Sequence, residues 1–444
     1  MRRSKGRSWK TFSIGLIVGV WLLAGDLGTT AAQGSEPRFD YTIEKNVMIP
    51  MRDGVRLAAD LYLPKGTGPF PVIVERTPYD KTGPVSAAAS NPTYYAARGY
   101  AVVVQDVRGR YASEGAFYPF QTDAQDGYDT VEWAAVQPWS NGKICTIGGS
   151  YTGMTQYLLA PTRPPHLVCM FVREAVSDLQ EEWVHPGGAF LLALNQAWAL
   201  TFMAPDQVKR LPQADRDRLT AELEKLRPQW NRTYTFLPLN EVPVLKELRW
   251  YQDWLTHPTD DPYWWPFAIV RQHDQIDVPI YHLGGWYDIF QRGTLVNFSG
   301  ITQRGRTEQA RRSQKLLMGP WVHGPRNVGK TQVGDVDFGP QAETDFYGLM
   351  LRWFDYWLKG IENGIMEEPP VKLFVMGENV WRFEHEWPLA RTKYTNYYLR
   401  SGPSDSTYSL NDGSLSLDAP VETERSDTYI YDPRTPTPTI GGLN

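Results

Sequence analysis

Apolar and polar residues near the start of the chain follow patterns typical of a β-hairpin and of buried strands. Two β-like runs, Asn46–Met51 and Val55–Leu63, flank Arg52-Asp53-Gly54, and Asp-Gly between such runs predicts a hairpin turn. The runs Pro71–Glu75 and Tyr100–Gln105 are largely apolar without alternation, as parallel strands covered on both faces require.

The pattern then alternates between helix and strand. A helical run, Asp126–Val136, precedes the apolar strand Ile144–Ile147, and the helix-like run Met154–Ala160 follows it. Strands that alternate with helices in this way predict an α/β fold with a mostly parallel sheet flanked by helices.

The character of the chain changes between about residues 175 and 270, where polar helical stretches alternate with Trp/Pro-rich pieces and predict a helical insertion. The sheet pattern resumes with Val278–Leu283 and Lys315–Met318, and Phe346–Leu358 has the pattern of an amphipathic helix. After about residue 390 only short β-like pieces are found. We therefore divide the chain into residues 33–174 (first part of the core), 175–272 (insertion), 273–390 (second part of the core) and 391–444 (incomplete β segment).

The first 32 residues resemble an export signal. A basic stretch precedes the short apolar run Phe12–Ala24, and small residues before Gln33 suggest a cleavage site. This predicts a periplasmic or secreted protein, with an uncleaved membrane anchor as the alternative. The formal net charge of the whole chain is −5 and becomes more negative without this basic stretch, which argues against a nucleic-acid partner.

Cys145 and Cys169 are the only cysteines, and both lie in apolar runs. Export permits a disulfide between them. Cysteines within strands are more often buried thiols, and the sequence favours that interpretation.

The segment Gly148-Gly149-Ser150-Tyr151-Thr152-Gly153 lies where a predicted strand gives way to a predicted helix. A serine held on a sharp strand-to-helix turn between small residues is the geometry of a nucleophile elbow. The usual pattern has its second glycine two residues after the serine, where this chain has Thr152. Gly/Ser turns are common, so the segment alone is a weak signal.

A nucleophilic serine needs a base to accept its proton and an acid to orient that base. In serine hydrolases with an α/β sheet these follow in the order Ser, Asp or Glu, His, each after the end of a strand. Asp288 follows the strand Val278–Leu283, and His323 follows Lys315–Met318. The other histidines lie inside strands, in the insertion or after no suitable strand, so Ser150, Asp288 and His323 form the predicted triad.

The oxyanion of an acyl-transfer intermediate needs two preorganised hydrogen-bond donors. The backbone N–H of Tyr151, directly after the serine, is one candidate. The second should lie after an early strand, where the chain has no glycine-rich loop but has Tyr79. The Tyr79 hydroxyl is therefore the second candidate.

One further motif is a decoy. Gly324–Thr331 matches the P-loop pattern letter for letter, but the residues that follow do not have a helical pattern. A P-loop must connect a strand directly to a helix, so nucleotide binding is not predicted. The sequence contains no metal-site spacing, and we expect neither a metal nor a cofactor.

Several motifs together resemble the bacterial cocaine-esterase and X-Pro dipeptidyl-peptidase family of α/β-hydrolases. The resemblance runs from about residue 45 to the C-terminus. Its motifs are Asn46–Leu57, Thr77–Lys81, Gln105–Gly109, Gly148–Gly153, Gly285–Asp288 and Gly319–His323. In that family the second glycine of the elbow stands where this chain has Gly153, so the displaced glycine is a feature of the family.

The resemblance implies a serine hydrolase that cleaves an ester or amide through an acyl-enzyme on Ser150. His323 would be the general base and acid, Asp288 would orient it, and Tyr79 and Tyr151 would form the oxyanion hole. The insertion would be a helical cap, and Trp183, Trp198 and Phe290 match positions that line the acyl pocket. We interpret Asp106 and Arg108 as a structural pair that stabilises a turn.

The family also carries a C-terminal jelly-roll domain, which needs more residues than follow position 390 in this chain. The sequence predicts only the start of that domain, and apolar surface left exposed by the missing part. An inactive hydrolase-like binding protein is therefore an alternative of another class.

Within the family, the alternative activities are an X-Pro dipeptidyl-peptidase and an α-amino-acid ester hydrolase or acylase. Each must hold a free substrate amine, for which Glu181 and Glu182 are the candidate carboxylates. The expected partner is a small-molecule ester or amide or a short peptide. The sequence does not decide between a monomer and a homo-oligomer.

Overall fold

A computed structural model describes residues 34–400, 414–421, 430–432 and 434–435. The predicted export signal, residues 1–32, lies outside the described residues. Among the helices that the structure describes, none combines the length and apolar character needed to cross a bilayer.

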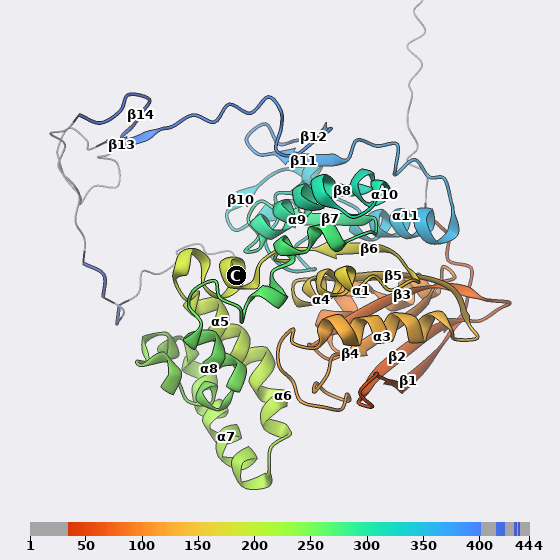
Figure 1. The fold of residues 1–444 in the computed structure, drawn as a ribbon, viewed down its shortest axis with the longest axis horizontal. Helices are drawn as coiled ribbons and strands as arrows, with labels where there is room; N and C mark the ends of the chain where they lie inside the picture. The colour runs from red at the N-terminus through yellow and green to blue at the C-terminus, as the bar shows by residue number, and fades with distance from the viewer. Residues whose placement is uncertain (1–33, 401–413, 422–429, 433, 436–444) are drawn as a thin grey trace, which may run out of the picture.

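A ten-stranded mixed sheet forms the centre of the molecule, with the strand order β1-β2-β4-β3-β5-β6-β7-β8-β11-β12 (Figure 1). The strands are β1 (Tyr41–Pro50), β2 (Arg56–Pro64), β3 (Phe70–Thr77), β4 (Ala101–Asp106), β5 (Ser140–Gly149), β6 (Leu167–Arg173), β7 (Ile280–Gly285), β8 (Gln314–Gly319), β11 (Val371–Val375) and β12 (Val380–Glu384). The neighbours from β4 to β11 pair in parallel, whereas β1–β2, β2–β4 and β11–β12 are antiparallel. The predicted hairpin and buried strands are confirmed, while β11 and β12 had no counterpart in the sequence prediction.

Helices cover both faces of this sheet. They are α1 (Pro84–Ser90), α2 (Pro92–Ala96), α3 (Asp123–Ala135), α4 (Tyr151–Leu159), α9 (Gln291–Arg304), α10 (Glu308–Arg312) and α11 (Phe346–Lys359). Successive side chains of a strand point to opposite faces, and β7 shows which helix lies on which face. The Tyr281 ring packs on Trp353 of α11, whereas His282 bonds Tyr157 of α4 and packs on Phe298 of α9. The α/β-hydrolase core predicted from the sequence is thus confirmed.

The helical insertion leaves the sheet after β6 and returns before β7. It contains α5 (Leu192–Trp198), α6 (Ala204–Lys209), α7 (Gln213–Leu226) and α8 (Arg249–Thr256), with π-helical segments at Gln180–Val184 and Ala199–Met203. Figure 1 shows these helices together on one side of the sheet. Asp178 and Ala268 form an isolated antiparallel bridge, so the two ends of the insertion meet beside the core.

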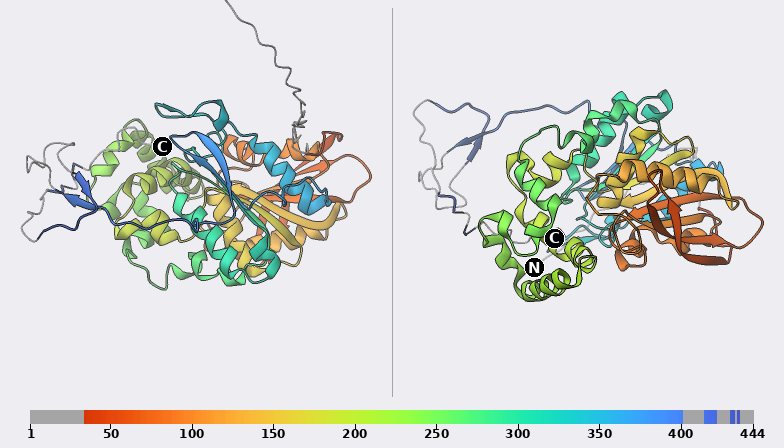
Figure 2. Two further views of the ribbon diagram at one scale, coloured as in Figure 1. Left: turned by 90° about the horizontal axis from the view of Figure 1, so that it is seen from above. Right: turned by 60° about the horizontal axis from the view of Figure 1, so that its bottom comes forward.

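Two short pairs of strands lie outside the main sheet. The strands β9 (Gln332–Val333) and β10 (Val336–Asp337) form one pair, and β13 (Tyr398–Arg400) and β14 (Ser414–Ser416) form the other. Both views of Figure 2 show β13 and β14 apart from the core. The side chains of Leu399 and Leu415 are exposed there.

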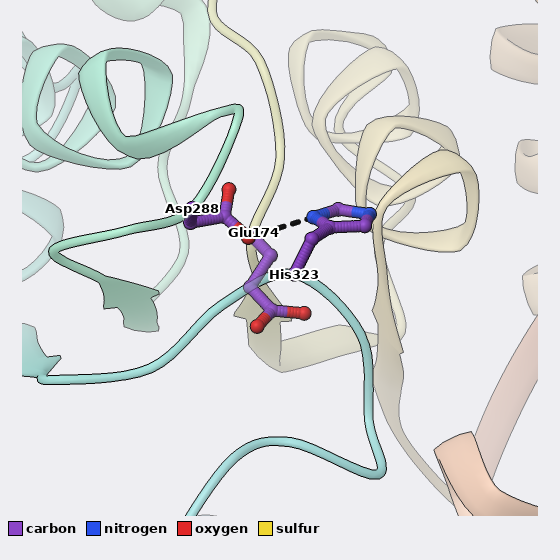
Figure 3. A group of neighbouring side chains, drawn as sticks. All are labelled: Glu174, Asp288 and His323. Atoms are coloured by element: carbon purple, nitrogen blue, oxygen red, sulfur yellow. Dashed lines mark hydrogen bonds and ion pairs between the residues drawn. The ribbon is translucent and has the colours of Figure 1, made fainter. Parts of the chain in front are cut away.

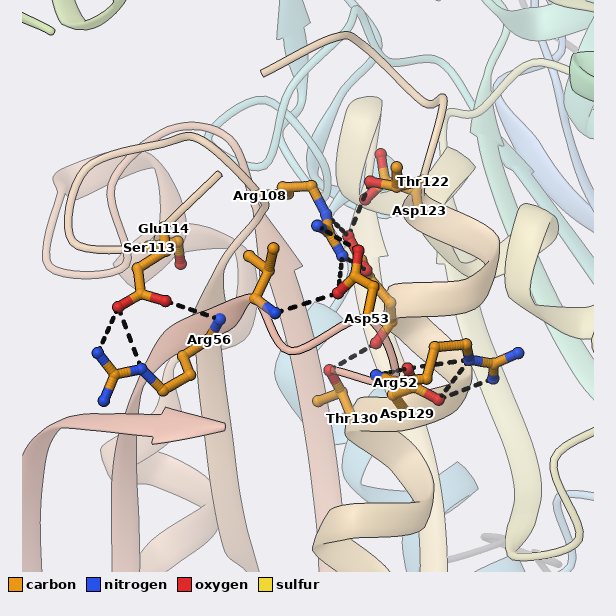
Figure 4. A network of polar contacts seen from close by, with 12 residues as sticks. Arg52, Asp53, Arg56, Arg108, Ser113, Glu114, Thr122, Asp123, Asp129 and Thr130 are labelled. Atoms are coloured by element: carbon orange, nitrogen blue, oxygen red, sulfur yellow. Dashed lines mark hydrogen bonds and ion pairs between the residues drawn. The ribbon is translucent and has the colours of Figure 1, made fainter. Parts of the chain in front are cut away.

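The turn between β1 and β2 is joined to the core by arginine–carboxylate pairs (Figure 4). Arg52 pairs with Asp129 of α3 at 2.7 Å. Arg108 lies between Asp53 of the turn, at 2.8 Å, and Asp126 of α3, at 2.6 Å. Arg52 and Asp53, which belong to the segment that predicted the hairpin turn, therefore also hold this turn against α3.

Two expectations are corrected by the structure. Cys145 and Cys169 lie opposite each other on β5 and β6 and form a disulfide, whereas the sequence favoured free thiols. Asp106 and Arg108 are not paired with each other. Asp106 accepts a hydrogen bond from the Lys81 backbone N–H at 2.8 Å, and Arg108 binds the carboxylates named above.

The P-loop-like segment lies in the loop after β8. No helix follows Thr331 within this fully described stretch, because the chain continues into β9. The strand-to-helix connection that phosphate binding requires is therefore absent from the segment.

Candidate active site

Ser150 lies at the point where β5 ends and α4 begins. Its backbone is in a region that residues other than glycine rarely adopt, with φ 59° and ψ −126°. The Ser150 N–H donates to the carbonyl oxygens of Arg173 and Glu174, both at 3.1 Å. The end of β6 thus holds the strained turn in place.

Close packing explains where the glycines of the elbow stand. A methyl group at Gly148 would lie 2.3 Å from Thr152 Oγ1, and one at Gly153 would lie 2.8 Å from Ala175 Cβ and 2.9 Å from the Arg173 carbonyl oxygen. The Thr152 hydroxyl accepts from the Gly149 N–H at 2.7 Å. Thr152 therefore stabilises the turn, and its neighbour Gly153 lies where α4 approaches β6.

Asp288 and His323 come together from loops that follow β7 and β8 (Figure 3). The distance between His323 Nδ1 and Asp288 Oδ2 is 2.7 Å, and Asp288 Oδ1 accepts from the Phe290 N–H at 2.6 Å. Burial opposes protonation of the imidazole. The charge and hydrogen bond of Asp288, with the Glu174 carboxylate, outweigh burial and raise the pKa of His323 above its usual value.

Glu174 is a third acidic residue at this centre, and the sequence analysis missed it. It follows β6 and is buried, and its Oε2 accepts from the Gly324 N–H at 3.0 Å. Burial and the nearby Asp288 raise the pKa of Glu174 to about 7. The available signal was its place directly after a buried strand, the same signal that identified Asp288 and His323.

Glu174, Asp288 and His323 are also the described residues whose potential ligand atoms lie within 4.8 Å of one another, close enough to hold a metal ion. His323 Nδ1 is already hydrogen-bonded to Asp288, so a cation at this nitrogen would compete with that bond.

A cavity of about 440 Å³ opens over Ser150 and His323. Trp183, Trp198 and Phe290 line it, as the resemblance implied, and Tyr79 lines it as well. Asp288 is buried on the Nδ1 side of the His323 imidazole and is not among the residues that line the cavity. A mostly apolar cavity above a serine and a histidine suits the acyl part of a hydrophobic substrate.

The two predicted oxyanion donors differ in their environments. The Tyr79 hydroxyl accepts from Trp198 Nε1 at 3.0 Å. Burial raises the pKa of Tyr79 to about 12, against smaller opposing effects of hydrogen bonds with Trp198 and Ser150, so the hydroxyl keeps its proton. The Tyr151 side chain is buried and donates to Asp123 Oδ2 at 2.9 Å. Tyr151 therefore offers the site its backbone N–H, in the first turn of α4, where no intrahelical acceptor exists.

The acids proposed to hold a substrate amine point elsewhere. Glu181 pairs with Arg292 at 2.9 Å, and Glu182 accepts from the Ser177 N–H at 2.6 Å. Among the described residues, the carboxyl groups that line the cavity are those of Glu75 and Glu174.

Comparisons with known proteins identify the family of this chain. Residues 53–325 match the model of the X-Pro dipeptidyl-peptidase (S15) family. The chain belongs to this family. Residues 363–440 match the C-terminal non-catalytic domain of X-Pro dipeptidyl-peptidases. Cocaine esterase from Rhodococcus sp. (strain MB1 Bresler) is 35% identical over 416 residues, which cover 91% of this chain and 70% of the esterase.

Two solved structures share the fold of this chain. An aminopeptidase from a marine sediment archaeon (Thaumarchaeota archaeon) has a TM-score of 0.67 and 24% identity, covering 90% of this chain and 66% of its own. An α-amino-acid ester hydrolase has the same TM-score and identity, covering 94% of this chain and 69% of its own. The family model and the similarity to cocaine esterase identify the protein as a serine hydrolase of the S15 family.

The packing around the elbow leads to a testable expectation. Gly153→Ala should lower the melting temperature and reduce hydrolytic activity, because the added methyl group meets backbone and Cβ atoms that cannot move easily. Overpacking of this kind typically costs about 1–3 kcal/mol. Gly127→Ala in α3 is the matched control, since its nearest neighbours are side-chain atoms at 3.1 and 3.2 Å. Equal melting temperatures for the two variants would contradict this explanation of Gly153.

Proposed function

We propose that the protein hydrolyses carboxylic esters with apolar acyl groups, through an acyl-enzyme on Ser150. The observation that carries this proposal is the hydrogen bond between His323 and Asp288 beside a strained Ser150, with Ser150 and His323 lining one apolar cavity. A serine, an oriented imidazole and a buried carboxylate are the parts that nucleophilic acyl transfer requires.

In the proposed mechanism, His323 Nε2 accepts the hydroxyl proton as Ser150 Oγ attacks the substrate carbonyl. The Tyr79 hydroxyl and the Tyr151 N–H donate to the oxyanion that forms, and Asp288 stabilises the imidazolium. His323 then gives its proton to the leaving alcohol, and the acyl-enzyme remains. A water molecule, deprotonated by His323, releases the acid and restores Ser150.

The cavity favours an ester over a substrate with a free amine. Trp183, Trp198 and Phe290 present aromatic surface to the acyl group. Glu75 could meet an amine, but burial raises its pKa to about 8, so it is largely neutral near pH 7. A neutral carboxyl group attracts an ammonium group weakly, which makes the peptidase and amino-ester alternatives second candidates.

A fluorophosphonate probe tests the triad. The wild-type chain should be labelled at Ser150, Ser150→Ala should not be labelled, and His323→Ala should lose about 10⁴-fold or more in kcat because no base remains. Mass spectrometry of the labelled peptide identifies the site. Folded wild-type protein that takes up no probe would refute the proposal and favour a binding protein.

A comparison of substrates tests the acyl preference. p-Nitrophenyl butyrate should be hydrolysed with a kcat/KM about a hundredfold or more above that of alanine p-nitroanilide. The aromatic walls bind the alkyl chain, Glu75 is largely neutral, and the charge of Glu174 already faces the Arg173 guanidinium at 3.7 Å. Initial rates are measured from the absorbance of the released p-nitrophenol or p-nitroaniline. The reverse order would favour the amino-acid substrates.

Tyr79→Phe tests the oxyanion hole. Loss of the hydroxyl removes one donor, so kcat for p-nitrophenyl butyrate should fall by about 10²–10³-fold with little change in KM. Tyr394→Phe is the matched control, since the Tyr394 side chain is exposed and is not among the residues that line the cavity. Unchanged kcat in a folded Tyr79→Phe variant would exclude Tyr79 as a donor.

A further inference from the structure

Glu174 contacts all three segments of the proposed triad. Its carbonyl oxygen accepts from the Ser150 N–H at 3.1 Å, and its own N–H donates to the Leu283 carbonyl oxygen, on the strand before Asp288, at 2.7 Å. Its carboxylate accepts from the N–H of Gly324, the residue after His323. We propose that Glu174 is a positioning residue, which aligns these segments and places a second negative charge beside the His323 imidazole.

The backbone of Glu174 has an unusual conformation for this role. Its φ is 48°, in the left-handed region that side chains other than those of Asn and Asp seldom adopt. The contacts with Ser150, Leu283 and Gly324 hold it there. Strained residues persist where the surrounding structure fixes them, and such residues cluster at active sites.

The carboxyl group is only partly satisfied by hydrogen bonds. Oε2 is bonded to Gly324, but Oε1 is buried and has no hydrogen-bond partner among the described residues. Buried polar atoms without a partner are uncommon and call for an explanation. The potential ligand atoms of Glu174, Asp288 and His323 lie within 4.8 Å of one another, so the imidazole has a carboxyl group on each of two neighbouring segments (Figure 3).

Several charged groups face Glu174 and affect its ionisation. Asp288 and His323 face it from the loops after β7 and β8, and Arg173 precedes it on β6, with a guanidinium nitrogen 3.7 Å from Oε2. Glu75 of β3 faces Arg173 in turn. Burial raises the pKa of Glu174 to about 7, so its negative charge is present above that pH and is lost as the pH falls.

An anion beside an imidazole favours its protonated form and raises its basicity. The ionised Glu174 would therefore stabilise the imidazolium that forms when His323 takes the Ser150 proton. This role rests on the proposed function of the triad. It differs from that of Asp288, because Glu174 accepts no hydrogen bond from the imidazole and acts through backbone contacts and charge.

Glu174→Gln separates charge from shape, because the amide oxygen can still accept from Gly324. We expect the variant to fold, and we measure kcat/KM on p-nitrophenyl butyrate from about pH 5 to about pH 9. The pH at which kcat/KM falls on the acid side (the acid limb) should shift to lower pH by about one unit, because loss of the anion lowers the pKa of His323. Glu174→Met should move the limb in the same direction. Glu174→Asp keeps the charge and should keep the wild-type limb.

Glu181→Gln is the matched control, since it neutralises a partly exposed carboxylate of the insertion that pairs with Arg292 of α9. An acid limb at the wild-type position in folded Glu174→Gln would overturn the proposal, whatever happens to stability. A wild-type chain that takes up no fluorophosphonate would instead refute the triad itself. The two failures are therefore distinguishable.

A second measurement needs no variant. The proton shared by His323 Nδ1 and Asp288 Oδ2 gives a low-field NMR signal that should shift twice as the pH changes, once for the imidazole and once for the neighbouring Glu174 carboxyl, because interacting groups titrate together. A single inflection would contradict the proposed charge on Glu174. This NMR titration of the wild-type chain also tests the proposed charge on Glu174 if the neutral variants fail to fold.

Discussion

The hydrogen bonds from the Ser150 N–H to the end of β6 are the constraint on which the rest of the site depends. They hold a serine in a backbone conformation that it would otherwise leave, and they fix α4 against β6. The disulfide between Cys145 and Cys169 joins the same two strands a few residues earlier. A covalent bond and a pair of hydrogen bonds thus set the distance between β5 and β6 just before the site begins.

From that fixed point the parallel register carries the remaining groups to one edge. The β6–β7 and β7–β8 pairs run in register up to the loops that carry Asp288 and His323. The carboxyl ends of neighbouring parallel strands meet at one edge of a sheet, where ligands commonly bind. The cap then supplies Trp183 and Trp198 above that edge, so that the sheet positions the polar groups and the insertion supplies the apolar walls.

The sequence predicted those site residues that are marked by their neighbours along the chain. Ser150 has its glycines, and Asp288 and His323 each follow an apolar strand, which is why these residues could be predicted as a triad from the sequence. Glu174 has the same position after β6, but no chemical motif marks it. The partner of its carboxylate, the N–H of Gly324, lies 150 residues away in the sequence. The pairing of Cys145 with Cys169 also depends on the β5–β6 register, which residue patterns do not give.

The other errors have similar causes. Asp106 and Arg108 are close in sequence, yet each binds a partner from another element, Lys81 for the first and Asp126 for the second. Nearness along the chain does not decide which charges meet in a folded core. The strands β11 and β12 were missed because Val371–Val375 and Val380–Glu384 are short, and β12 is an edge strand with a mostly solvent-facing pattern.

The meeting of the two ends of the cap has a consequence for how this protein could diversify. Asp178 and Ala268 are paired, and the Val270 N–H donates to the Ser177 carbonyl oxygen at 3.1 Å, so the whole insertion enters and leaves the core through one narrow neck. Segments with adjacent ends can be replaced or lengthened without disturbing the domain that carries them. The walls that Trp183 and Trp198 contribute to the cavity therefore belong to a separable module, which can vary while the strands beneath stay the same.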